Sequence, residues 1–168
     1  MVPEAMPVPW ALSFILEFGD KWKATLPFCT STTGPEPALG PPASYRRMAP
    51  LEPRAADVEA AAELLDGARL PVIHAGSGVI HAQAFAELAQ LAERLHAPVD
   101  TSWSARGVLP ETSPLAWPMI HIEACNRLRN EADVVLCLGS QLGETDWWGK
   151  PPYWAPPARQ RLVQVDVD

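Results

Sequence analysis

Two glycines, Gly76 and Gly78, are the residues of this chain whose type and spacing best fit a chemical role. They follow a short β-branched run and precede a long amphipathic stretch, the layout in which an α/β sheet presents backbone N–H groups to an anion. Gly76-x-Gly78 is half of a dinucleotide fingerprint: His81 replaces its third glycine, and Asp100 is the only candidate for the ribose-binding acid. We therefore predict a turn that packs helix on strand, with phosphate binding as the alternative.

A second group of residues, His121, Glu123, Cys125 and Cys137, has the residue types of a zinc deaminase. That chemistry also needs a C-x-x-C pair, and the sequence has none. Successive residues of a helix turn by about 100°, so positions 121, 123 and 125 would not share a face. We predict a packed or exposed histidine beside buried cysteines, with no metal site and no catalytic residue.

The stretch from Trp147 to Trp154 holds three tryptophans and a tyrosine, and it follows Glu144 and Asp146. It comes after an expected strand, at the edge where open α/β sheets bind ligands, so a pocket is one interpretation. Large exposed aromatics are also typical of contacts with another domain or chain, and we favour that interface. Asp166, near the end of the last expected strand, is either a ribose ligand or a solvated carboxylate.

Hydrophobic periodicity predicts the sheet that would position these residues. The expected strands are 71–74, 99–102, 134–138 and 162–167, and the expected helices are 55–66, one long helix from the glycine turn to about His96 with Phe85 on its apolar face, and 122–130. Strands that alternate with helices imply a doubly wound sheet with right-handed crossovers. The predicted fold class is α/β: a three-layer, Rossmann-like parallel sheet with helices on both faces. His74, inside a strand, is expected to be a hydrogen-bonded core residue.

Residues 1–53 differ from the rest of the chain, because 10 of its 19 prolines fall there. Proline removes a backbone donor and forces its neighbour into an extended conformation. We predict a proline-rich arm or remnant of a preceding domain, poorly ordered, followed by one domain over residues 54–168.

Composition excludes several classes of partner. A net charge of −7 argues against a nucleic-acid groove, because phosphate neutralisation needs clustered Lys and Arg. The three cysteines, at positions 29, 125 and 137, have no disulfide or zinc-site spacing and favour a reducing cytoplasm. The apolar run from Trp10 to Phe18 is far too short to span a membrane. We expect a cytoplasmic protein without a nucleic-acid or membrane partner.

Several motifs in order resemble one family. They are Ala62–Leu65 before Arg69–Ile73, the turn Ala75–Val79, then Leu88–Val99, Thr101-Ser102, Arg106–Glu111, Ser113–Leu115, Ala132–Gly139 and the closing Val163–Asp168. Together they resemble the central domain of thiamine diphosphate-dependent enzymes, the group of acetolactate synthase, pyruvate oxidase and benzoylformate decarboxylase. The resemblance covers about residues 50–168 and identifies the family but not the substrate.

The resemblance implies a scaffold domain. In such enzymes two other domains hold thiamine diphosphate and Mg²⁺: one supplies an activating glutamate, and the other a Gly-Asp-Gly to Asn motif. Neither is recognisable in this sequence. The resemblance therefore implies a fragment, truncated at its C-terminal end before the last strand of the domain and inactive alone. Its implied partners are the other domains of the same enzyme, which would be a homo-oligomer at full length.

Some members of this family bind FAD or ADP with the central domain. Carried over, the contacts would be Gly76, Ser77, Gly78, Thr101, Ser102, Gly139, Ser140, Gln141 and Asp166. The chain departs from those members, because Trp117–Ile120 replaces a glycine-rich loop and Gln141 replaces a basic residue. Two alternatives to the scaffold stay open: a free-standing nucleotide-binding module, and an interaction module that uses the aromatic stretch.

Overall fold

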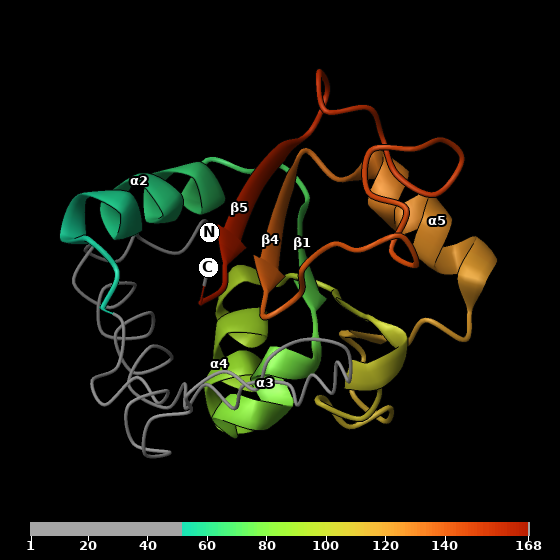
Figure 1. Cartoon of the computed structure of the whole chain (residues 1–168), viewed down its shortest axis with the longest axis horizontal. Helices are drawn as coiled ribbons and strands as arrows, with labels where there is room; N and C mark the ends of the chain where they lie inside the picture. Colours follow the sequence, from blue (N-terminus) through green and yellow to red (C-terminus); the bar gives the residue numbers. More distant parts are fainter. Residues whose placement is uncertain (1–51, 168) are drawn as a thin grey trace, which may run out of the picture.

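Five parallel strands organise the part of the chain that the computed structural model describes, residues 52–167 (Figure 1). The elements in order are α2 (Ala55–Asp66), β1 (Pro71–Ala75), α3 (Ser77–Ala82), α4 (Phe85–Leu95), β2 (Val99–Thr101), the 3-10 helix η2 (Trp103–Ala105), β3 (Ala116–Trp117), α5 (Ile122–Glu131), β4 (Val134–Leu138) and β5 (Arg161–Val165). The predicted arm, apart from residues 52 and 53, lies outside the described residues.

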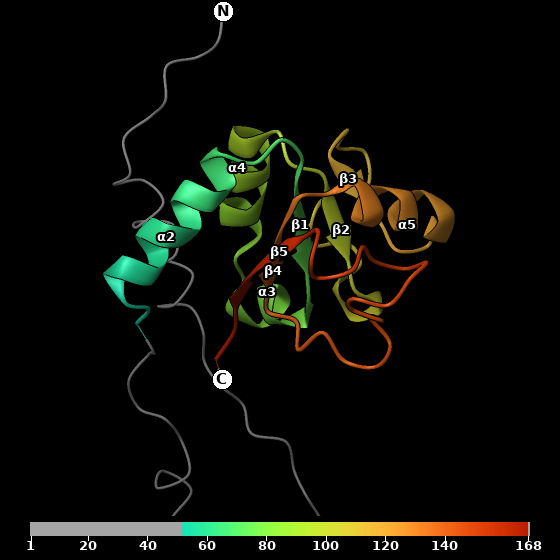
Figure 2. The ribbon, with the colours of Figure 1, turned by 90° about the horizontal axis from the view of Figure 1, so that it is seen from above.

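The strand order is β3-β2-β1-β4-β5, and every neighbouring pair is parallel. All five residues of β1 and all five of β4 are buried, which is why these strands read as continuous apolar runs. Figure 2 shows α4 and α5 on opposite sides of the sheet. The predicted three-layer, Rossmann-like α/β fold is therefore confirmed. Its strand order reverses between β1 and β4, the position at which such sheets bind ligands.

The face covered by α3 and α4 is apolar. Leu88, Leu91 and Ala92 recur at helical spacing along α4 and are buried against the sheet. From β1 and β4 the residues Ile73 and Leu136 meet them in one continuous core. This face is the main hydrophobic core of the described residues.

The single long helix expected after the glycine turn is in fact two helices. Gln83 ends α3 in the left-handed conformation, at φ 55°, and its N–H donates to the carbonyl of Ile80. The N–H of the buried Ala84 donates to the carbonyl of Val79, so the chain changes direction before α4 begins. Phe85 is consequently 42% exposed and does not lie on the buried face.

The strands also differ from expectation. β1 ends one residue later, β2 ends one residue earlier, and β5 spans 161–165 instead of 162–167. The proline-marked loop after β2 contains the short strand β3. Two residues are too few to show a period of two, so pattern alone could not find β3. Among the described residues, none of the helices is long and apolar enough to cross a membrane.

The face covered by α5 has a smaller apolar cluster. It consists of Val72, Leu128, Ala132, Val135 and Trp154. Trp154 belongs to the long segment between β4 and β5, which folds back over this face. Partly buried Trp117, Trp148, Tyr153 and Leu162 pack against this cluster, and charged side chains are buried beside it.

Candidate functional site at the carboxyl edge of the sheet

The glycine turn after β1 packs against the turn after β4. The N–H of Gly76 donates to the carbonyl of Leu138 at 2.8 Å, and that of Gly78 donates to the carbonyl of Gly139 at 3.0 Å. A Cβ on Gly76 would collide with the Gly139 carbonyl, and Gly139 itself has φ +61°. Glycine is needed here because two backbones touch. These contacts support the packing role, and phosphate binding by the turn stays a prediction.

The other predicted contacts lie at the same edge. Thr101 ends β2, Ser102 follows it, Ser140 and Gln141 follow β4, and Asp166 follows β5. The N–H of Ser102 donates to the carbonyl of Ala75 at 2.9 Å, so the ends of β1 and β2 are joined. One carboxylate oxygen of Asp166 accepts the N–H of Val167 at 2.7 Å. The contacts above bring Gly76 and Gly78 to Gly139, whereas Gln141 is exposed.

Asp100, the candidate ribose-binding acid, is fully buried in the core. Its Oδ2 accepts from Nδ1 of His74 at 2.7 Å, and its two oxygens accept from Nε and Nη2 of Arg129 at 2.7 and 2.9 Å. His74 is 0% exposed and Arg129 is 2% exposed. The carboxylate is therefore engaged from two sides by charged or polar donors, and it is not presented to a ribose. The prediction that His74 is a hydrogen-bonded core residue is confirmed.

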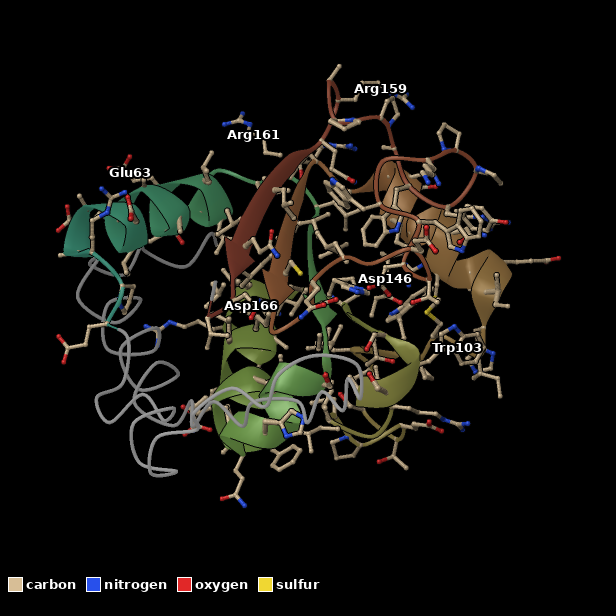
Figure 3. All side chains as sticks on the ribbon, in the orientation of Figure 1. Glu63, Trp103, Asp146, Arg159, Arg161 and Asp166 are labelled. Atoms are coloured by element: carbon tan, nitrogen blue, oxygen red, sulfur yellow. The ribbon has the colours of Figure 1, made fainter. Side chains whose placement is uncertain are left out.

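Asp146, which is labelled in Figure 3, brings the segment after β4 next to His74. Its side chain is 8% exposed, with Oδ1 3.8 Å from Nε2 of His74. Its Oδ2 accepts from the hydroxyl of Ser140 at 3.1 Å, and its backbone carbonyl accepts from the indole N–H of Trp154 at 2.6 Å. We call His74, Asp100, Arg129 and Asp146 the buried charged cluster. It is sealed from solvent, so its chemistry is to hold elements together.

The aromatic stretch therefore divides into a buried part and a surface part. Trp154 is 0% exposed, meets His74 edge to face at 5.4 Å between ring centroids, and lies 4.7 Å from the Arg129 guanidinium. Interpreting this tryptophan as an exposed interface residue was wrong. Trp147 is 45% exposed, stacks on Tyr153 at 5.1 Å, and has the Lys150 ammonium 5.4 Å from its ring centre. This surface part remains available to a partner.

The two cysteines are packed as expected. Burial raises the pKa of both Cys125 and Cys137 to about 12, with nearby Asp100 and Asp146 adding to the respective shifts. His121 lies exposed just before α5 begins. Across residues 52–167, no three His, Cys, Asp or Glu side chains form a group that could hold a metal ion.

Sequence reasoning missed Arg129 and Gln160. The Gln160 amide donates to the carbonyls of Arg129 and Ala132 at 2.6 and 3.0 Å, which caps the end of α5. A signal for Arg129 existed: with Cys125 and Leu128 it occupies positions i, i+3 and i+4 on one helix face. A buried arginine requires a buried carboxylate, and Asp100 was available.

Comparison with known proteins identifies what the chain resembles. Residues 58–168, more than half of the chain, match the family model described as thiamine pyrophosphate enzyme, central domain. Sulfoacetaldehyde acetyltransferase of Alcaligenes xylosoxydans xylosoxydans is 40% identical over 67% of this chain and 19% of that protein. The same enzyme of Castellaniella defragrans is 41% identical over 68% and 20%, and acetolactate synthase isozyme 1 large subunit of Escherichia coli is 32% identical over 64% and 19%.

The chain spans about a fifth of the length of the curated relatives that it matches. A solved protein from Mycobacterium smegmatis, described as a putative thiamin diphosphate-dependent enzyme, has a TM-score of 0.49 and 24% identity, over 65% of this chain and 21% of that one.

Proposed function

Because this chain belongs to the thiamine pyrophosphate enzyme family as its central domain, we propose that it is the scaffold of a larger carboligase or decarboxylase and is not catalytic alone. The family match over residues 58–168 is the observation that carries the proposal. The share of the relatives that the chain covers supports it, because about four fifths of such an enzyme lies outside the segment that this chain matches. Sulfoacetaldehyde acetyltransferase and acetolactate synthase make an acyl-transferring enzyme the first candidate.

The described residues do not fit a Mg²⁺–diphosphate group. Mg²⁺ in proteins prefers carboxylate and carbonyl oxygens, and residues 52–167 offer no cluster of acidic side chains able to hold a metal. The N–H groups of Gly76 and Gly78 already donate to Leu138 and Gly139. We therefore assign thiamine diphosphate and Mg²⁺ to the other domains of the proposed enzyme, and no reaction step to residues of this chain.

The contribution of this chain is instead rigidity at the carboxyl edge. Contacts between the turns after β1 and β4 fix the end of the sheet, and Asp146 holds the segment after β4 against it. Catalytic groups need supports whose positions do not drift. In the proposed enzyme this edge holds the neighbouring domains in fixed positions relative to one another.

Activity of the isolated and extended chains tests the proposal. Purified chain mixed with thiamine diphosphate, Mg²⁺ and pyruvate is expected to release no CO₂ above a protein-free control. The DNA that flanks the coding region is expected to encode a Gly-Asp-Gly to Asn motif, and a chain extended through it to bind thiamine diphosphate in the presence of Mg²⁺. Turnover by the isolated chain would refute the scaffold assignment.

For FAD and ADP we propose weak binding or none. The proposal concerns the nine contacts carried over at the sheet edge: Gly76, Ser77, Gly78, Thr101, Ser102, Gly139, Ser140, Gln141 and Asp166. It is supported by the occupied glycine N–H groups and by the bond from the Ser140 hydroxyl to Asp146, while Gln141 offers no cation for a diphosphate. Calorimetric titration with FAD, ADP and NAD tests it. Low micromolar binding of any of them would favour a nucleotide-binding module.

We also propose the cytoplasm as the compartment and a homo-oligomer as the state of the full-length enzyme. Buried free thiols at Cys125 and Cys137 suit a reducing compartment. Cell fractionation and light scattering on the full-length enzyme test the two statements separately.

A further inference from the structure

We propose that the buried charged cluster binds one proton on His74, so that a doubly protonated imidazole bridges Asp100 of β2 and Asp146 and clamps residues 143–155 onto the carboxyl edge of the sheet. The proposal concerns the protonation and docking of this chain alone. It stands whether or not the scaffold assignment does.

The charge count of the cluster requires a further positive charge. Asp100 and Asp146 contribute two negative charges, and Arg129 contributes one positive charge, at side chains that are 0%, 8% and 2% exposed. Without a proton on His74 the core holds one uncompensated charge, and burying such a charge is strongly unfavourable. With that proton the cluster is neutral.

Neither of the two buried thiols near His74 supplies the balance. Cys137 of β4 is the register partner of His74 in β1. Cys125, on α5, lies near Asp100. Burial raises the pKa of both thiols to about 12, so both are neutral near pH 7. The groups that face the imidazole are thus Asp100 from β2, Cys137 from β4, Asp146 from the segment after β4, and Arg129 from α5 through Asp100 and Trp154.

The geometry places a carboxylate at each ring nitrogen of His74. Nδ1 donates to Asp100 at 2.7 Å. Nε2 is buried without a hydrogen-bond partner, and Asp146 Oδ1 lies 3.8 Å from it. A neutral imidazole with its proton on Nδ1 would turn a lone pair toward this carboxylate, whereas an Nε2–H group is attracted to it. A proton on Nε2 would therefore account for the carboxylate of Asp146 lying beside a buried nitrogen that has no hydrogen-bond partner.

The same contact would act as a clamp. Asp146 also accepts from Ser140 and, through its carbonyl, from the Trp154 indole. Trp154 in turn packs on His74 and Arg129. The proton on Nε2 is therefore the charge that attracts the segment to the sheet, and its loss would free Asp146 and expose the Trp154 indole.

Nitrogen NMR of the full 168-residue chain tests the proton directly. Near neutral pH, both ring nitrogens of His74 are expected to carry protons, and the exposed His81, His96 and His121 serve as internal reference signals. His74→Gln identifies the signals. A wild-type spectrum in which His74 has only one protonated nitrogen would overturn the proposal.

Charge removal tests the bridge. Asp146→Asn leaves Asp100 and Arg129 balanced, so His74 is expected to lose the Nε2 proton and keep the Nδ1 proton. Glu144→Gln is the matched control, because it removes an exposed charge two residues away and is expected to leave His74 unchanged. Hydrogen exchange of the Trp154 indole N–H is expected to be on the order of tenfold faster in Asp146→Asn only. If His74 keeps both protons in Asp146→Asn, or the exchange is unaltered, the clamp is wrong.

Discussion

The two faces of the sheet bury different kinds of side chains. The face under α3 and α4 is apolar, with Ile73, Leu88 and Leu136 buried among similar side chains. The face under α5 buries an aspartate, an arginine and a histidine beside a tryptophan. The first depends on volume and shape, and the second depends on each charge keeping its partner.

This difference predicts opposite responses to substitution. On an apolar face the cost of a deletion grows with the cavity left behind, and distant deletions add. On the charged face the pair gives little net stability, because desolvation offsets attraction, yet loss of one partner leaves a buried charge. The charged face should therefore be fragile to single changes and tolerant of matched ones.

Arg129→Met is expected to have the largest effect. It leaves the buried carboxylate of Asp100 without its two guanidinium hydrogen bonds. The free energy of unfolding is expected to fall by about 4 kcal/mol. Adding Asp100→Asn should restore a substantial part of that loss, measured by urea unfolding as a double-mutant cycle. Additive losses from the two changes would show that the charged face does not behave as a coupled unit.

Leu88→Ala is the corresponding change on the apolar face. Leu88 is 0% exposed, and its truncation is expected to cost about 3 kcal/mol with no single partner able to rescue it. Phe85→Ala, at a residue that is 42% exposed on the same helix, is expected to cost about 0.5 kcal/mol or less. Equal losses for the two variants in urea unfolding would contradict the placement of Phe85 outside the core.

The apolar face was predictable from the sequence, and the charged face was not. Helical spacing of Leu88, Leu91 and Ala92 and the apolar runs of β1 and β4 give fold class and layers directly, because both signals are local. The cluster joins His74 to Asp100 and Arg129 over 26 to 55 residues of chain, and no local period reports such a pairing. Asp100 was accordingly considered as a ribose ligand and Trp154 as an interface residue.

The candidate site was predictable in outline for a similar reason. The rule that ligand-binding turns follow strands placed Gly76, Gly78 and Gly139 at one edge of the sheet. It could not show that the N–H groups of the first turn are used by the second, since that contact depends on the spacing of β1 and β4 in three dimensions. The split at Gln83 was equally hidden, because a left-handed glutamine leaves no mark in hydrophobic periodicity.

Gly76→Ala tests the contact between the turns after β1 and β4, at the carboxyl edge of the sheet. A Cβ there would collide with the Gly139 carbonyl and with Ser140, so the two turns must separate, at an expected cost of about 2 kcal/mol. Gly143→Ala is the matched control, because a Cβ at that position meets no atom within 4 Å. Thermal unfolding of both variants measures the difference. Similar midpoints for the two would remove close packing as the reason for glycine at position 76.

Asp133→Asn is expected to cost less than the changes at Arg129, Leu88 and Gly76, and it tests whether charge also matters at the opposite end of the sheet. The Asp133 carboxylate accepts the N–H groups of Arg69 and Leu70 at 2.8 and 2.9 Å, which ties the start of β4 to the chain entering β1. Partial burial favours the neutral acid, but these hydrogen bonds outweigh it and hold the pKa of Asp133 below its ordinary value of 3.8. A carboxyl whose pKa is lowered on folding stabilises the protein above its unfolded pKa, and that contribution is lost as the pH falls through the folded pKa.

The loss for Asp133→Asn near neutral pH is therefore expected to be about 1 kcal/mol, kept small by solvent around this half-buried group. The gap between wild type and variant should close as the pH falls below 3.8, because the wild-type carboxyl then becomes neutral as well. Urea unfolding over a pH series measures it, with Asp66→Asn, an exposed change of the same charge, as the control. A gap that stays constant down to the acid limit would mean that shape, and not charge, makes the contact at Asp133. Sensitivity to buried charge would then be confined to the cluster under α5.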